Sequence, residues 1–433
     1  MRIIRDYWLE IVLAIFSFTL LLLTVLPYFY GFKIQSDYPR LISSVSDNSG
    51  LVIEVVSYEK HWFSSNAELM IKDQDKQFLY KFKHKIIHGP VYLGLLLDGR
   101  SPLVSMVIKG MIQPAKIDQS FLSKILSANP VQLNAYIGFN GVDEVVALLP
   151  AVSQKVDGIT FQVAAANLKM KYFSHENRFK GDITTPSILL YGRSHVEVER
   201  FLLNFDEVVD SHGVSGDIVL SFDALKFRLM QRSVNLKAIS SRFKNSITDD
   251  LLNLEMDFNA SKLNLFNEQV NSLSFGLNVE KFDLGKISKD IFYAYNEPYF
   301  DLTAYEYNLL NIDHFNFFSE YGTFSATMLM KSAVKNELTQ MNYLSTKDSE
   351  LSVRLSTDLL KRLYELVFSN IDVPVKNVDV VLKNMLRLRY LDKNLDKIKL
   401  NVSGKDNVFI INDQRVGFDD LSNNIMKNIF SNY

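Results

Sequence analysis

An uncharged apolar segment near the start of the chain constrains its fold more than any other feature. Residues 11–32 read IVLAIFSFTLLLLTVLPYFYGF and contain no Asp, Glu, Lys or Arg. A helix over this segment would be ~33 Å long, which is enough to cross a bilayer core of ~30 Å. So long an uncharged run is not typical of a buried core helix. We therefore expect a membrane-spanning helix at residues 11–32 that attaches the rest of the chain to a lipid bilayer.

The residues around this segment predict its orientation. Arg2 and Arg5 precede it, and cytoplasmic flanks favour Lys and Arg. Trp8 and Tyr28 lie near its two ends, where amphipathic rings prefer the level of the lipid headgroups. We expect residues 1–10 to be cytoplasmic and the bulk of the chain to lie on the far side of a single-pass anchor.

A cleaved signal peptide is the alternative to an uncleaved anchor. Signal peptides carry a shorter apolar region of about 7–15 residues, followed closely by a small-x-small cleavage site. The segment is longer than that, and the LPYFY sequence at residues 26–30 is a poor cleavage site. We therefore favour the anchor, which Pro27 should kink or end because proline lacks an N–H.

Composition excludes some classes of function. The 433 residues include 47 Lys and Arg and 49 Asp and Glu, so the basic face that a nucleic-acid-binding protein needs is not indicated. The chain has no Cys, which rules out disulfides and thiolate metal sites. Hydrophobic residues make up 47% of the chain, which is ample material for a core.

Alternating patterns dominate residues 33–284. After a polar stretch at 35–50, expected to be a short helix or linker, residues 78–86 place aromatic rings on one face and Lys81, Lys83 and Lys85 on the other. That period of two is typical of a half-buried strand. Similar strands are expected near residues 51–56, 67–72, 103–113, 131–140, 166–173, 216–222, 234–238, 252–258 and 273–279. One-sided strands joined by short polar turns favour antiparallel sheet.

Helical patterns cluster in residues 285–433, which we expect to form a mixed α/β region after a boundary near Gly285. The expected helices cover residues 287–295, 357–368, 375–390 and 418–430, with an earlier one at 117–128 and a hairpin at 399–411. The predicted fold class is α+β but mainly β. It comprises an N-terminal transmembrane helix, a long twisted antiparallel sheet, and amphipathic helices toward the C-terminus that cover part of the sheet.

No motif in the chain requires a particular chemistry. Residues 94–101 (GLLLDGRS) nearly match a phosphate-binding loop, but Arg100 stands where Lys is needed and a strand-like segment follows. His84 and His88 have the spacing of a helical zinc pair, but on a strand they would be ~13 Å apart. The adjacent Asp pairs at 249–250 and 419–420 suit turns or helix starts. We therefore expect no catalytic residues, no cofactor and no metal site.

Two short stretches are less generic. The first follows a strand and comprises Trp62, Phe63, Ser64 and Ser65. The second ends a strand and comprises His88, Gly89 and Pro90. A structural interpretation is favoured, in which bulky rings fill the end of a sheet and Gly-Pro stops the ladder of strand hydrogen bonds. A ligand site is the alternative.

On these stretches the chain resembles the YdgA-like family of bacterial envelope proteins, a group of unknown function. That family has an N-terminal anchor, an R-G-x-F-S-S motif after a strand, and a long strand ending in H-G-P. Here Lys60 replaces the Arg, and His61 or Trp62 replaces the Gly. Residues 136–141 and 408–414 resemble the family's aromatic-glycine strand and closing hairpin, although Asn412-Asp413 replaces Asn-Gly. The resemblance implies an inner-membrane anchor and a periplasmic location, with no established catalytic residues to carry over.

The leading functional hypothesis is a non-enzymatic, inner-membrane-anchored periplasmic protein, which acts as a scaffold or binds apolar ligands such as lipid on its extended sheet. An uncovered apolar face would form a groove for a lipid chain, and the strand-rich build is analogous to AsmA-like proteins. The first alternative is a module that docks another envelope protein. The second is a hydrolase of envelope polymers, which would need carboxylates or histidines to converge in a cleft; His61, His88 and an acid within hydrogen-bond reach would support it. Expected partners are therefore the bilayer, through residues 11–32, a lipid or an envelope protein, and no nucleic acid.

Overall fold

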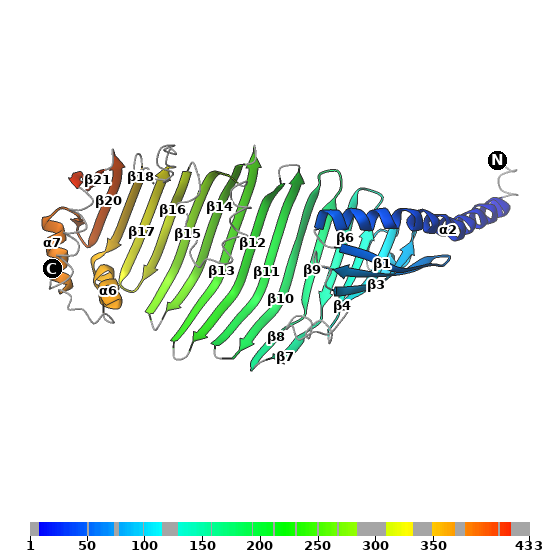
Figure 1. Ribbon diagram of the computed structural model, residues 1–433, viewed down its shortest axis with the longest axis horizontal. Helices are drawn as coiled ribbons and strands as arrows, with labels where there is room; N and C mark the ends of the chain where they lie inside the picture. Colours follow the sequence, from blue (N-terminus) through cyan, green and yellow to red (C-terminus); the bar gives the residue numbers. More distant parts are fainter. Residues whose placement is uncertain are drawn as a thin grey trace. The chain divides into compact units, whose positions relative to one another are not determined.

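The computed structural model confirms a mainly antiparallel β fold (Figure 1). It describes residues 8–49, 52–72, 78–97, 99–114, 129–156, 158–192, 194–210, 213–229, 232–248, 251–265, 268–283, 309–331, 349–368, 377–405 and 408–416. These residues form two compact units, unit 1 up to Gly192 and unit 2 from Arg193. The boundary predicted near Gly285 lies outside the described residues and stays a prediction.

The N-terminal segment is one helix, α2 (Trp8–Ser49), which continues through Pro27 and Pro39. The prediction that Pro27 could end the helix is therefore wrong, and most of the polar stretch at 35–50, expected to be a separate short helix or linker, belongs to the same helix. Within it, Phe16–Arg40 is long and apolar enough to cross a membrane. The chain thus has one N-terminal helix of membrane-spanning length and composition.

Unit 1 is an antiparallel sheet that follows the chain closely. Its strands are β1 (Val52–Lys60), β2 (Ser64–Lys72), β3 (Phe78–His88), β4 (Met106–Pro114), β5 (Val131–Ile137), β6 (Val142–Leu149), β7 (Val152–Val156), β8 (Ile159–Val163), β9 (Ala166–Phe173) and β10 (Arg178–Tyr191). They pair in the order β1-β2-β3-β4-β5-β6-β9-β10. Strands β7 and β8 continue the lines of β6 and β9, so that β7 pairs with β8 and β8 pairs with the same side of β10 as β9. The one-turn helix α3 (Gly94–Leu97) lies between β3 and β4.

The second half of α2 covers one face of the first strands. Ile34, Tyr38 and Ile42, at helical spacing, are buried with Leu69 and Ile86 of the sheet. Burying each large aliphatic side chain contributes ~1.5–3 kcal/mol. The predicted alternation of β3 is confirmed, because its even-numbered residues from 82 to 88 face this core and its lysines do not.

Unit 2 is an antiparallel sheet of longer strands. They are β11 (Ser194–Asp210), β12 (Gly213–Leu229), β13 (Arg232–Thr248), β14 (Leu251–Leu265), β15 (Glu268–Asp283), β16 (Leu309–Ser319), β17 (Gly322–Lys331), β18 (Ser349–Ser356), β19 (Asp392–Asn394), β20 (Lys397–Lys405), β21 (Val408–Ile411) and β22 (Gln414–Val416). The main strands pair in the order β11-β12-β13-β14-β15-β16-β17-β18-β20-β21-β22. Strand β19 pairs with β20.

Two amphipathic helices, α6 (Thr357–Phe368) and α7 (Val378–Arg387), lie at the β18–β20 end of this sheet (Figure 1). They match the helices predicted at 357–368 and 375–390. Leu359 of α6 and Leu382 of α7 share a buried cluster with Leu355 and Ile398 of the strands. The helices predicted at 117–128, 287–295 and 418–430 lie outside the described residues.

Candidate functional site: the helix seat and the apolar face

Two hydrogen-bonded groups lie where α2 packs on the sheet of unit 1; we call them the helix seat. In the first, the Tyr38 hydroxyl of α2 lies 2.7 Å from Nε2 of His84. In the second, the Tyr58 hydroxyl donates to Ser65 Oγ over 2.9 Å, and Ser65 Oγ lies 2.8 Å from Nε2 of His88. The two histidines that the sequence singled out therefore serve separate contacts on one strand face, and neither is paired with the other.

The Ser65–His88 pair has the spacing of a nucleophile and its base but not the access. Hydroxyl and imidazole within hydrogen-bond reach can activate a serine for attack. Here Ser65 is 0% exposed and His88 is 2% exposed, so a substrate has no path to either group. The pair is therefore suited to positioning the helix.

The remaining motif residues bond either α2 or backbone near these groups. The Trp62 indole N–H donates to the carbonyl of Thr24 over 2.7 Å, and the amide of His88 donates to the carbonyl of Phe63 over 2.9 Å. The other motif residues bond nearby backbone, with Ser64 accepting from His61, Gly89 donating to Ser105 and Pro90 accepting from Val104. The structure thus brings both motifs together beside α2.

Close approach of α2 to the sheet depends on Gly31. A Cβ atom at this position would lie 2.5 Å from Cε1 of His88, closer than real side chains approach. A residue without a side chain therefore lets the helix backbone rest against the buried imidazole.

Burial keeps both histidines of the helix seat neutral. It lowers the pKa of His84 to about 4, and it also lowers the pKa of His88 although backbone groups of Trp62 and Pro27 act in the opposite direction. Protonating either ring would place a positive charge in this buried position beneath α2.

We expect unit 1 to lose stability as the pH falls from ~6.5 toward 5. An unfolded imidazole titrates near pH ~6.5, so the unfolded chain binds protons in this range while the buried rings do not. For His84 the loss should reach ~2 kcal/mol at pH 5. Denaturant unfolding of the full chain in detergent, at pH 7.5 and pH 5, measures it, and His84→Gln should reduce the difference. Equal stability at both pH values would contradict a buried neutral His84.

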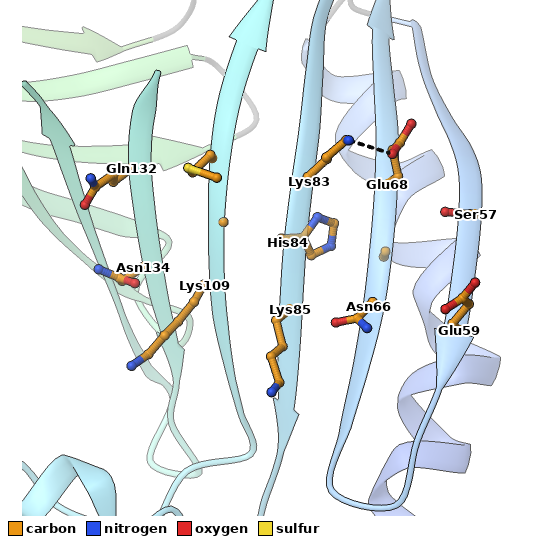
Figure 2. A pocket seen from close by; sticks show the side chains of 13 residues that line it. Ser57, Glu59, Asn66, Glu68, Lys83, His84, Lys85, Lys109, Gln132 and Asn134 are labelled. Carbon is orange, nitrogen blue, oxygen red and sulfur yellow. Dashed lines mark ion pairs between the residues drawn. The ribbon is translucent and has the colours of Figure 1, made fainter. Parts of the chain in front are cut away.

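A polar cleft of about 600 Å³ lies over the first five strands (Figure 2). Two cross-strand rows line it, namely Glu68–Lys83–Met111–Gln132 and Asn66–Lys85–Lys109–Asn134. Lys83 lies 3.7 Å from Glu68, and Lys81 also pairs with that carboxylate. His84 borders the cleft, but its Nε2 is held by Tyr38. The cleft offers charged surface without a nucleophile and base positioned together among the residues that line it.

Unit 2 carries the second candidate site, a broad apolar face. Three cross-strand rows form it. The first is Phe205, Ile218, Phe243, Met256, Leu277, Ile312, Met328, Leu351, Val402 and Ile411; the second is Leu203, Leu220, Ser241, Phe258, Phe275, Phe315, Ala326, Val353 and Leu400; the third is Phe222, Ile239, Ala260, Leu273, Phe317, Phe324, Leu355 and Ile398. Ser241 is their one polar member.

The opposite face of the same strands is polar. One of its rows reads Ser221, Ser240, Asn259, Ser274, Asn316, Ser325, Arg354 and Lys399. On the apolar face, every side chain of the first row from Phe205 to Val402 is half-buried. The described helices α6 and α7 stand at the β18–β20 end (Figure 1). The sheet is therefore one-sided, and much of its apolar side is not sealed by described residues.

The structure gives little support for metal or phosphate chemistry. Among the described residues, no group of three or more His, Asp or Glu side chains could hold a metal ion. The segment that resembles a phosphate loop forms the single turn α3 and then a β-bridge at Leu103. His61 lies beside Asn66, whereas His88 is held by Ser65.

The comparison with known families fits this arrangement. A family model described as a bacterial protein of unknown function (DUF945) matches residues 8–304. The chain belongs to this family. The DUF945 match includes α2, the helix seat and the strands of unit 2 as far as β15. No curated protein and no solved structure matches the chain.

Some residues of these candidate sites could not be identified from the sequence. Tyr38 and Tyr58 complete the helix seat, yet nothing local distinguishes them from other tyrosines. Tyr38 has its role because a helix residue meets a strand residue 46 positions later, and Tyr58 because it meets Ser65 of the neighbouring strand. For the apolar face, the alternation within each strand could be read from the sequence, but the register between strands could not.

Proposed function

We propose that this DUF945 protein is a non-enzymatic, membrane-anchored envelope protein that binds lipid acyl chains along the apolar face of unit 2. The observation that carries the proposal is the continuity of that face. Its first row is apolar on all ten strands that it crosses, from Phe205 to Ile411.

The dimensions of the face support an acyl chain as its occupant. Neighbouring strands lie ~4.8 Å apart, so the first row extends ~43 Å. Two acyl chains end to end make up a bilayer core of ~30 Å, so the row is longer than one chain needs. A lipid tail neither donates nor accepts hydrogen bonds, which matches rows that contain Ser241 as their single polar side chain.

The location follows from the anchor. We propose that the N-terminal part of α2 spans the inner membrane with its N-terminus in the cytoplasm, because Arg2 and Arg5 precede it. Both units then lie in the periplasm, next to a supply of lipid. The YdgA-like resemblance, carried by residues 60–65 and 88–90, is compatible with the DUF945 match and supports the same address.

Crosslinking from membranes tests the lipid proposal. The full chain is reconstituted in vesicles of phosphatidylethanolamine and phosphatidylglycerol that carry a diazirine on one acyl chain, and it is then irradiated and digested. We expect lipid adducts on peptides from β13–β17 in addition to the adducts on α2 that any anchor would give. Native mass spectrometry should show bound phospholipid after gentle extraction.

Adducts confined to α2, together with no bound phospholipid, would overturn the proposal. Crosslinking in cells separates it from the alternative of a docking module. A single envelope protein joined to β13–β17, with no lipid adduct there, would support docking instead.

A further inference from the structure

Several large apolar side chains are exposed at one end of the unit 1 strands. The connections β1–β2, β3–β4 and β5–β6 all lie at this end of the strands, because antiparallel strands return the chain to the same end at every second connection. They carry Trp62, Phe63, Leu96, Leu97, Leu103 and Phe139, which we call the apolar rim. These six side chains are between 50% and 91% exposed. Such clustering on a surface marks an interaction site.

The anchor helix passes the sheet at this same end of the strands. The rings of Tyr28 and Trp62 have centroids 4.5 Å apart, and those of Tyr30 and Phe139 are 6.1 Å apart. Trp62 also bonds the carbonyl of Thr24. The helix from Ile34 to Ile42 is buried against the sheet, so the part free to enter lipid lies before Ile34.

That free part has the character of a lipid-embedded helix. Its described side chains include Leu13, Phe16, Phe18 and Leu21, each more than half exposed. The uncharged segment 11–32 is ~33 Å long as a helix, and Tyr28 and Tyr30 lie near its end, so a bilayer core of ~30 Å that receives this segment would end close to the apolar rim. The membrane surface and the rim therefore lie at the same level of α2.

We infer that the apolar rim is a second membrane contact, which inserts into the headgroup and outer acyl region of the bilayer that receives α2. The inference rests on the membrane anchor of the proposed function, but not on lipid binding by unit 2. Trp and Phe at the level of the headgroups, beside exposed Leu, are the side chains that this region favours.

The short helix α3 is built to present leucine side chains outward. Leu95 is 1% exposed and packs with Val104 and Val107, while its neighbours Leu96 and Leu97 are 56% and 91% exposed. One leucine thus fixes the turn and the next two project from it. If α2 and these three connections all contact the bilayer, this end of the unit 1 strands lies on the membrane and the opposite ends of β2 and β3 point away from it.

Site-directed fluorescence tests the inference directly. The chain contains no Cys, so single-cysteine variants can be labelled without removing any residue. An NBD fluorophore is placed at Leu97→Cys on the rim, at Phe18→Cys on the anchor, and at Glu54→Cys near the far end of β1. Glu54 forms an exposed pair with Lys72, whose loss should cost little.

The labelled full chain is reconstituted in phosphatidylethanolamine–phosphatidylglycerol vesicles that contain lipids with nitroxides near the headgroup or deep in the chain. We expect shallow nitroxides to quench the Leu97→Cys probe at least twofold more than the Glu54→Cys probe. Aqueous iodide should show the reverse order. Deep nitroxides should quench the Phe18→Cys probe most.

Each outcome is decisive. If Phe18→Cys is quenched by deep nitroxides while Leu97→Cys behaves like Glu54→Cys, the anchor stands and the rim inference is overturned. If Phe18→Cys is also open to iodide, the membrane anchor itself fails. Thermal unfolding of each labelled variant shows whether its unit 1 is folded.

Discussion

A Gly89→Ala variant is expected to lose most of the stability of unit 1. An ideal Cβ at this position would lie 2.1 Å from the carbonyl oxygen of Val104 and 2.5 Å from that of Ser105. Both are backbone atoms, and Gly89 and Pro90 also exchange hydrogen bonds with this segment, so it cannot easily move away. Overpacking against a fixed backbone should lower the free energy of unfolding by ~3–5 kcal/mol. Denaturant unfolding of the full chain in detergent measures the change.

Gly99→Ala is the matched control for this variant. Gly99 has a φ of +68°, and an ideal Cβ there would meet no atom of the described residues within 4 Å, so only backbone strain opposes alanine. That strain costs ~1 kcal/mol. Equal stability of the Gly89→Ala and Gly99→Ala variants would contradict a structural role for the His-Gly-Pro motif. Loss confined to Gly89→Ala would support it.

The faces of individual strands could be predicted from the sequence because side chains alternate along a strand with a period of two. In β3 the lysines fall on one face and the buried residues on the other, as expected. In β14 and β15 the apolar residues at even positions 252–258 and at odd positions 273–279 each share a face. The local pattern is sufficient here because each strand has one wet face.

The length of α2 could not be predicted in the same way. Pro27 removes one helical hydrogen bond, which suggested a kink or an end to the helix. Packing reverses that expectation, because Ile34, Tyr38 and Ile42 bury a helical face on the sheet and Trp62 bonds the backbone at Thr24. Contacts from the sheet, distant in sequence, therefore sustain the helix past proline.

The apolar face was predictable in kind but not in extent. A sequence shows that Phe258, Phe275 and Phe315 each lie in an alternating or apolar stretch. It does not show that the three are direct cross-strand neighbours, because register depends on turns and bulges between them. Strand β15 shifts register against β16 near Gly276, and such shifts leave no clear mark in composition. The continuous rows therefore appear only in the structure.

A charge on the apolar face should remove bound lipid. Leu277 lies between Met256 and Ile312 in the first row, far from α6 and α7 along the strand order. In a Leu277→Glu variant, an acyl chain over this row would have to desolvate a carboxylate, which costs several kcal/mol. We expect at least a tenfold loss of lipid adducts on β13–β17, measured by diazirine crosslinking in the same vesicles, with adducts on α2 unchanged.

Ser274→Glu is the matched control because it adds the same charge to the same strand on the polar face. Its cross-strand neighbours are Asn259 and Asn316, which carry no charge. We expect lipid adducts on β13–β17 at the level of the unmodified chain. An Ala326→Trp variant, which adds bulk without charge beside Phe315, should also reduce adducts if the face is the groove. Equal adduct levels in Leu277→Glu and Ser274→Glu, with both variants folded by circular dichroism, would show that acyl chains do not occupy this face.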